Sequence, residues 1–257
     1  MILSASEAYI HNIENKPYYD SEMDAKMCDR YYCDAVFVPE ELHLLLTKTH
    51  THHLKYSPHE YVYPWVDLQE NLQLKSLYSG QELDPVEVIE EDLRLFKTLK
   101  EGGFSASSDI LFNTEHVVPQ SWFDGKEPMR GDLHHLFACE PACNSMRSNH
   151  PFYDFQTYEP ELAASGIRSG CGMVEEGKFE PEYGKGIVAR AVFYFTLRYK
   201  DVIQLDAQMN FEVLLGWHLE HPVTLYEKHR NAAIQELQGN RNPFIDFPEM
   251  AEVMLGL

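Results

Sequence analysis

A stretch in the middle of the chain, from Asn113 to Asn149, gathers side chains that could carry out hydrolytic chemistry. It contains the adjacent pair Glu115 and His116 and, further along, Asn144. A hard divalent ion such as Mg²⁺ prefers oxygen ligands, keeps several waters and takes only one or two protein groups in phosphate chemistry. Glu115 and Asn144 are therefore predicted to form a magnesium site.

A histidine next to such a site can act as a base, because its charge changes near neutral pH. We predict that His116 takes a proton from an attacking water while the metal offsets charge on a phosphate. Arg130 or Arg147 would add a guanidinium that stabilises the same charge. The predicted chemistry is metal-assisted hydrolysis of a phosphate ester.

Three further polar residues, Asp132, His134 and His135, lie between these groups in the sequence. One of the histidines could stand behind the site and hold His116 or a metal-bound water. A structural histidine is the equal alternative for either. Asp132 is more typical of a structural carboxylate that caps an element or bonds the backbone.

The cysteines raise a second metal possibility. Cys139 and Cys143 precede Asn144 closely, and Cys171 follows. The three thiols could bind a structural Zn²⁺, with a fourth ligand from Cys28, Cys33 or a histidine. A disulfide and free buried thiols are the alternatives, although five cysteines without a signal peptide do not suggest a complete disulfide framework.

Short elements must position the central residues. The segment ILFNTEHVV at 110–118 has strand composition, and 133–138 can return as a second strand. Residues 143–149 are predicted to form a short helix. Because successive strand side chains point to opposite faces, Glu115 could hold a metal while His116 reaches a nearby water.

Helical signals surround this core. A Pro followed by acidic residues opens a helix over 39–46, and Asp84 followed by Pro85 opens an amphipathic helix that ends at Gly102. Residues 61–66 are aromatic and interrupted by Pro64, which predicts an edge strand or packed loop.

The second half of the chain is predicted to be a helical layer. Residues 186–199 form a nearly all-apolar helix, 205–221 a second one with Asp206 as its cap, and 224–239 a third. The third begins with a capping box at Thr224 and ends at Gly239, which suits the left-handed cap position.

These segments define an α+β fold class. We expect one mainly helical domain spanning 1–257, built around a small ββα core at about 110–150, with helical layers at about 84–100 and 186–255. No repeat, low-complexity segment or linker divides the chain.

The formal net charge of −20 argues against a general nucleic-acid-binding surface, although a local cleft is compatible with it. No run approaches the roughly 18 apolar residues of a membrane-spanning helix, and the first residues show no basic leader with an apolar core. As written, the sequence predicts a cytoplasmic protein, or a secreted or periplasmic one if it is a trimmed mature form.

Three motifs together resemble a known family. They are EHVVPQSW at 115–122, DLHHL at 132–136 and NSMRSN at 144–149. This order is similar to that of the endonuclease I family of bacterial nucleases, whose site is a ββα-metal, or His-Me, finger. The likeness also includes YSG at 78–80 and extends from about 55 to 248.

The resemblance implies metal-dependent cleavage of DNA, with RNA as an alternative substrate, without sequence specificity and leaving 5′-phosphate ends. It implies Mg²⁺, or Mn²⁺ or Ca²⁺ in the same site, held by Glu115 and Asn144, with His116 as general base. Arg130 or Arg147 would stabilise the transition state. An inhibitor protein is a candidate partner, and the oligomeric state is left open.

Two other functions remain as alternatives. One is a non-catalytic, zinc-stabilised module that binds nucleic acid or protein and keeps the fold. The other is a phosphoesterase for small substrates, which would use the same chemistry.

Overall fold

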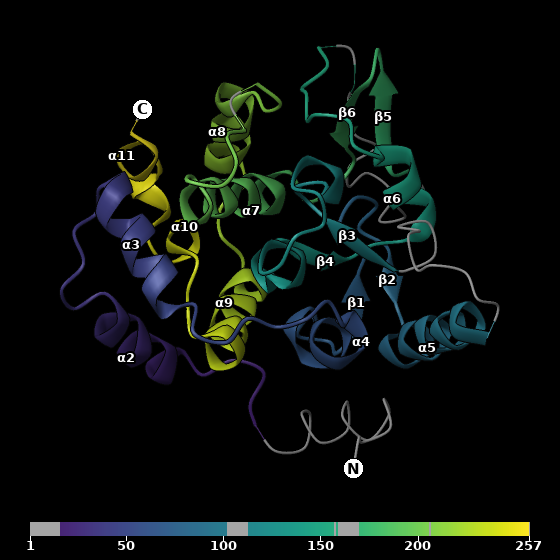
Figure 1. Cartoon of the computed structure of the whole chain (residues 1–257), viewed down its shortest axis with the longest axis horizontal. Helices are drawn as coiled ribbons and strands as arrows, with labels where there is room; N and C mark the ends of the chain where they lie inside the picture. Colours follow the sequence, from purple (N-terminus) through teal and green to yellow (C-terminus); the bar gives the residue numbers. More distant parts are fainter. Residues whose placement is uncertain (1–15, 102–112, 157, 159–169, 206, 257) are drawn as a thin grey trace. The chain divides into compact units, whose positions relative to one another are not determined.

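The structure is a computed structural model that describes residues 16–101, 113–156, 158, 170–205 and 207–256. The fold is α+β, as predicted, with about half of the chain in helices and only small sheets (Figure 1). None of the described helices is long and apolar enough to cross a membrane.

The chain divides into two compact units. The first consists mainly of Ser57–Pro119 and Leu136–Gly184, and the second of Pro17–Tyr56, Gln120–His135 and Lys185–Leu257. Each unit is described by itself below. The single-domain organisation expected from the sequence stays a prediction.

The first unit contains three two-stranded antiparallel sheets among its described residues, together with helices. Its elements in order are α4 (Pro58–Tyr61), the π-helical turn η1 (Val62–Val66), β1 (Leu74–Lys75), β2 (Glu82–Leu83), α5 (Pro85–Glu101), β3 (Thr114–His116), β4 (Leu136–Ala138), α6 (Pro141–Arg147), β5 (Gly172–Glu175) and β6 (Lys178–Pro181).

Strands β3 and β4 form the centre of this unit. They pair antiparallel, with Glu115 opposite Phe137 and His116 opposite Leu136, and all six of their residues are buried. Helix α6 follows β4 directly and begins at Pro141, a residue suited to the first helical turn. The order strand, strand, helix agrees with the sequence-based expectation for this region.

The second unit is helical in the residues that the structure describes. Its elements are α2 (Ser21–Tyr31), α3 (Pro39–Thr49), three short 3₁₀ turns η2 (Gln120–Trp122), η3 (Met129–Gly131) and η4 (Leu133–His135), then α7 (Lys185–Arg198), α8 (Phe211–Glu220), α9 (Leu225–Gln238), α10 (Pro243–Asp246), the 3₁₀ turn η5 (Pro248–Met250) and α11 (Ala251–Leu255).

Helix α7 is the core of the second unit and packs against α3, α8, α10 and η4. Nearly all of its side chains are buried, including Arg190, which donates to both carboxylate oxygens of Glu227 at 2.6 and 3.1 Å. A buried arginine requires such a partner because an unpaired charge in the interior is costly.

The predicted helices at 39–46, 84–100, 186–199 and 224–239 are confirmed by α3, α5, α7 and α9. The capping box at Thr224 and the left-handed Gly239 are present as predicted. The predicted helix at 205–221 is shorter than expected, since α8 begins at Phe211 with Asn210 as its cap. The proposed cap Asp206 lies outside the described residues.

Two predictions for the remaining segments were wrong. Residues 61–66 form neither an edge strand nor a loop, because Val62–Val66 is a buried π-helical turn that continues α4. The segment 133–138 is a strand only from Leu136 onward and begins as the 3₁₀ turn η4.

Candidate active site

Helix α6 and strand β3 bring four predicted site residues together in the first unit: Glu115, His116, Asn144 and Arg147. Each of these residues is at most 8% exposed. Arg147 Nη1 lies 3.1 Å from Glu115 Oε1, and Asn144 Nδ2 donates to the backbone oxygen of Thr114 at 2.8 Å. Glu115, His116 and Asn144 are therefore placed by neighbouring elements.

Two buried side chains hold the Oε1 atom of the Glu115 carboxylate. The hydroxyl of Tyr78 donates to Oε1 at 2.6 Å, and the Arg147 guanidinium lies near the same atom. Hydrogen bonds to a charged acceptor are the stronger ones, so these two donors fix the orientation of the carboxylate.

Asn144 is oriented in a comparable way. Because its amide nitrogen donates to the Thr114 carbonyl, its side-chain oxygen is on the opposite side of the amide group. An amide oxygen and a carboxylate oxygen form an oxygen-only donor set, which suits Mg²⁺ better than a softer metal. The residues present therefore fit the metal implied by the sequence.

Arg147 also donates hydrogen bonds to the backbone that directly follows Glu115. Its Nη1 and Nη2 donate to the carbonyl oxygens of His116 at 3.4 Å and Val117 at 2.7 Å, and its guanidinium stacks over Phe152. These contacts favour a positioning role for Arg147. Its predicted role in stabilising the transition state stays a prediction.

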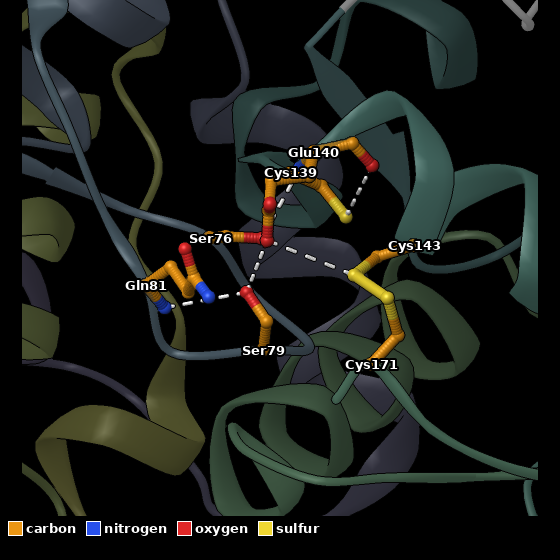
Figure 2. The surroundings of a disulfide bond; sticks show 7 residues. All are labelled: Ser76, Ser79, Gln81, Cys139, Glu140, Cys143 and Cys171. Atoms are coloured by element: carbon orange, nitrogen blue, oxygen red, sulfur yellow. Dashed lines mark hydrogen bonds between the residues drawn. A yellow bond between two sulfur atoms is a disulfide. The ribbon is translucent and has the colours of Figure 1, made fainter. Parts of the chain in front are cut away.

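The cysteines near the site form a disulfide and not the predicted zinc centre. Cys143 in α6 is bonded to Cys171, the residue before β5, while Cys139 is a buried free thiol (Figure 2). Disulfide sulfurs offer no thiolate, and burial raises the pKa of the Cys139 thiol well above its ordinary value. The described residues include no cluster of three His, Cys, Asp or Glu side chains that could hold a metal ion.

Comparison with known proteins agrees with this geometry, since residues 40–249 match the Endonuclease I family. The chain belongs to the endonuclease I family. The resemblance inferred from the three motifs is thereby confirmed, and the match includes every residue of the candidate site.

Three named proteins are similar to this chain over part of its length. An "Extracellular ribonuclease" of Bacillus subtilis (strain 168) is 35% identical over 159 residues, which cover 55% of this chain and 53% of that protein. An "Extracellular deoxyribonuclease" of Aeromonas hydrophila is 31% identical over 155 residues, covering 51% and 64%. A "Periplasmic deoxyribonuclease" of the same organism is 30% identical, covering 51% and 62%. The chain thus spans between half and two thirds of the length of these relatives.

The remaining predicted site residues, Arg130, Asp132, His134 and His135, belong to the second unit. Arg130 stacks over Tyr56 at 5.0 Å. The assignment of Arg130 to the transition state stays a prediction, as does a supporting role for either histidine.

Asp132 is the centre of a buried hydrogen-bond network in that unit. Its carboxylate accepts the hydroxyls of Tyr194 and Tyr199 at 2.7 and 2.8 Å and the amide of Gln238 at 3.0 Å. This agrees with the structural role favoured from the sequence. Burial lowers the pKa of His134 to about 4, so this ring is neutral at neutral pH.

Sequence reasoning missed one residue that contacts the site, namely Tyr78. Its only signal was the YSG motif at 78–80, which was interpreted as a turn with a counterpart in the family. Its contact with Glu115 depends on folding across 37 positions of sequence separation, which local patterns do not encode.

Proposed function

We propose that this protein is a metal-dependent endonuclease that hydrolyses phosphodiester bonds of DNA and RNA and leaves 5′-phosphate ends. The observation that carries the proposal is the placement of Glu115, His116 and Asn144 by β3 and α6, within a chain of the endonuclease I family. Similarity to proteins named deoxyribonucleases and a ribonuclease supports nucleic acid as the substrate class.

Each residue has a separate task in this proposal. Glu115 and Asn144 would hold Mg²⁺, or Mn²⁺ or Ca²⁺, because carboxylate and amide oxygens are the ligands that such ions prefer. When bound, the metal offsets the negative charge that grows on the phosphate and the leaving oxygen. His116 takes a proton from the attacking water. Arg147 holds the backbone of His116 through its carbonyl oxygen.

The structure does not favour the alternative of a zinc-stabilised binding module. That alternative required thiolates at Cys139, Cys143 and Cys171, whereas two of these sulfurs are joined to each other. The disulfide, together with relatives named extracellular and periplasmic, supports a place of action outside the cytoplasm. Fractionation of the cells that make the protein tests this location.

The deciding experiment is a plasmid-cleavage assay. Supercoiled DNA incubated with the protein and Mg²⁺ should be nicked and then degraded, EDTA should stop the reaction, and His116→Ala should lose at least about 100-fold in rate. His52→Ala replaces an exposed histidine outside the site and should retain full activity. Equal inactivity of wild type and His116→Ala across Mg²⁺, Mn²⁺ and Ca²⁺ would rule the proposal out.

A second assay decides the substrate class. Plasmid DNA, single-stranded RNA and a small phosphodiester should be compared at the same metal concentration. Cleavage of the small diester alone would replace the endonuclease by a phosphoesterase for small substrates.

A further inference from the structure

The loop between β1 and β2, Ser76–Gln81, is fixed against the centre of the first unit. The backbone of Leu77 donates to Ala138 O at 2.9 Å, and the backbone of Tyr183 donates to Tyr78 O at 2.8 Å. Gly184 lies so close that a Cβ there would stand 2.5 Å from Leu77 O, and it has a positive φ of 79° that favours glycine. Backbone hydrogen bonds with Ala138 and Tyr183 therefore hold the loop in place.

This loop contacts the beginning of α6, the helix that carries Asn144. The backbone of Glu140, the residue that precedes α6, donates to Ser76 Oγ at 3.1 Å, and the Ser79 hydroxyl donates to the Glu140 carboxylate. Figure 2 shows the Glu140 carboxylate between Ser79 and the sulfur of Cys143, 3.7 Å away.

The same loop also contacts β3 through Tyr78. This side chain is fully buried, its ring packs edge-on against Phe179, and its hydroxyl donates to Glu115 Oε1 at 2.6 Å. A buried phenol held by its own packing has little freedom to leave this hydrogen bond, so it acts as a fixed donor.

We propose that Tyr78 is a positioning residue for the metal site, whose hydroxyl fixes the orientation in which the Glu115 carboxylate meets the divalent ion. This inference rests on the proposed function, because it assigns a support to the ligand assumed there. Partners that orient a metal ligand contribute to metal affinity, and their loss typically costs about 10- to 100-fold in affinity or activity.

The loop therefore links both proposed ligands. Tyr78 orients the carboxylate of Glu115, while Ser76 and Ser79 fix the residue from which α6 starts, four positions before Asn144. A displacement of this loop would move both oxygen ligands together.

The test is Tyr78→Phe, which removes one hydroxyl and keeps the ring that packs against Phe179. Mn²⁺ binding measured by the electron paramagnetic resonance signal of the free ion should weaken about tenfold or more. The metal concentration for half-maximal DNA cleavage should rise by the same factor. The melting temperature in EDTA separates this effect from a loss of folding.

Tyr153→Phe is the matched control, because Tyr153 lies in the same unit and its ring packs against Phe155 and Lys178. It should bind Mn²⁺ as wild type does. The inference is overturned if Tyr78→Phe keeps an Mn²⁺ affinity within twofold of wild type, even with a lower melting temperature. If wild type neither binds Mn²⁺ nor cleaves DNA, the proposed function itself fails.

A second variant covers the case in which Tyr78→Phe does not fold. 3-Fluorotyrosine at position 78 keeps the hydroxyl and makes it a stronger donor. Because a stronger hydrogen bond withdraws negative charge from the Glu115 carboxylate, the Mn²⁺ affinity should fall measurably. An unchanged affinity in that protein also overturns the inference.

Discussion

The guanidinium of Arg147 has three neighbours that are costly to separate from it. It is fully buried, lies 3.1 Å from the Glu115 carboxylate and donates to the carbonyl oxygens of His116 and Val117. Its five donors form a rigid fork that reaches all three groups at once. One residue thereby neutralises the proposed metal ligand and holds the backbone of the proposed base.

Replacing Arg147 should destabilise the protein. Arg147→Met leaves the Glu115 carboxylate buried without its cation, and breaking a buried pair in this way costs about 3–5 kcal/mol. We expect the free energy of unfolding to fall by about that amount in urea titrations with EDTA. Arg30→Lys, at an exposed position of α2, should change it by less than about 0.5 kcal/mol.

Metal binding gives this prediction a second readout. A divalent ion at Glu115 would replace part of the lost positive charge, so Mg²⁺ should restore some stability to Arg147→Met. An unchanged unfolding free energy in EDTA would show that the Arg147 contacts contribute nothing to the folded state.

The residue types of the candidate site could be predicted from the sequence. The side chains that hold those residues in place could not. Glu115, His116 and Asn144 are recognisable because their chemistry suits a metal and a base. Tyr78 reaches Glu115 only in the folded chain. Its phenol could equally be an ordinary core residue, and neither its position nor its type distinguishes the two cases.

Helix α6 is attached at both of its sides to other elements of the first unit. The Cys143–Cys171 disulfide joins it to the start of β5, and Asn144 bonds β3. The sequence favoured a zinc site for these thiols because cysteine spacing alone does not reveal which sulfurs meet. The pairing depends on how residues 28 positions apart are folded together.

Loss of this disulfide should destabilise α6 and, with it, the site. Closing a loop of 28 residues contributes about 3–4 kcal/mol by the chain-entropy relation. Cys171→Ser should lose about that much unfolding free energy and should cleave DNA more slowly, while Cys33→Ser, an exposed free cysteine, should match wild type.

Wild type gives an independent check of this cross-link. At a fixed, saturating Mg²⁺ concentration, dithiothreitol should lower its stability to that of Cys171→Ser, whereas a zinc-selective chelator should not, because disulfide sulfurs hold no zinc. Loss of stability with the zinc-selective chelator, without any effect of dithiothreitol, would favour the zinc site instead.

Helix α5 is connected to β3 by a buried carboxylate. Asp92 accepts the hydroxyl of Tyr63 at 2.8 Å and both the backbone and side-chain nitrogens of Asn113 at 3.3 and 3.2 Å. Burial raises the pKa of Asp92 from 3.8 to about 6, although these hydrogen bonds oppose the shift.

The raised pKa predicts a loss of stability with rising pH. The folded state binds the Asp92 proton more tightly than the unfolded state does, so this contribution is complete below about pH 4 and is lost as pH rises through about 6. A shift of about two pH units corresponds to about 3 kcal/mol.

Asp92→Asn removes this titration. The unfolding free energy of the variant minus that of wild type should rise by about 3 kcal/mol between pH 4 and pH 7. The amide itself adds a cost that does not depend on pH, so it does not affect this change. Carbon-13 NMR of the Asp92 carboxyl should show a midpoint near pH 6. A midpoint below pH 4 would contradict the prediction.

Among the elements, long helices could be predicted and one short segment could not. Helices α5 and α9 have apolar periodicity and capping residues over many positions, so several signals agree. The turn Val62–Val66 is only five residues long and entirely buried, and its aromatic composition suits a strand equally well. Tertiary burial decided its conformation.

For the molecule as a whole, the net charge of −20 acts on any nucleic acid that approaches it. Phosphate contacts normally make binding weaker as salt rises, by about 10³- to 10⁵-fold between 50 and 200 mM for six to ten contacts. Here the long-range field of the protein repels DNA, and salt screens that repulsion as well. The two effects oppose each other.

The apparent Michaelis constant for plasmid DNA should therefore change by less than about tenfold between 50 and 200 mM NaCl at fixed Mg²⁺. Initial rates over a range of DNA concentrations measure it. A dinucleotide with a single phosphodiester meets little of the long-range field, so its Michaelis constant should be nearly independent of salt. If the constant for the plasmid instead rises by two orders of magnitude or more, a local cationic surface dominates over the overall charge, and the DNA contacts must come from clustered lysines and arginines.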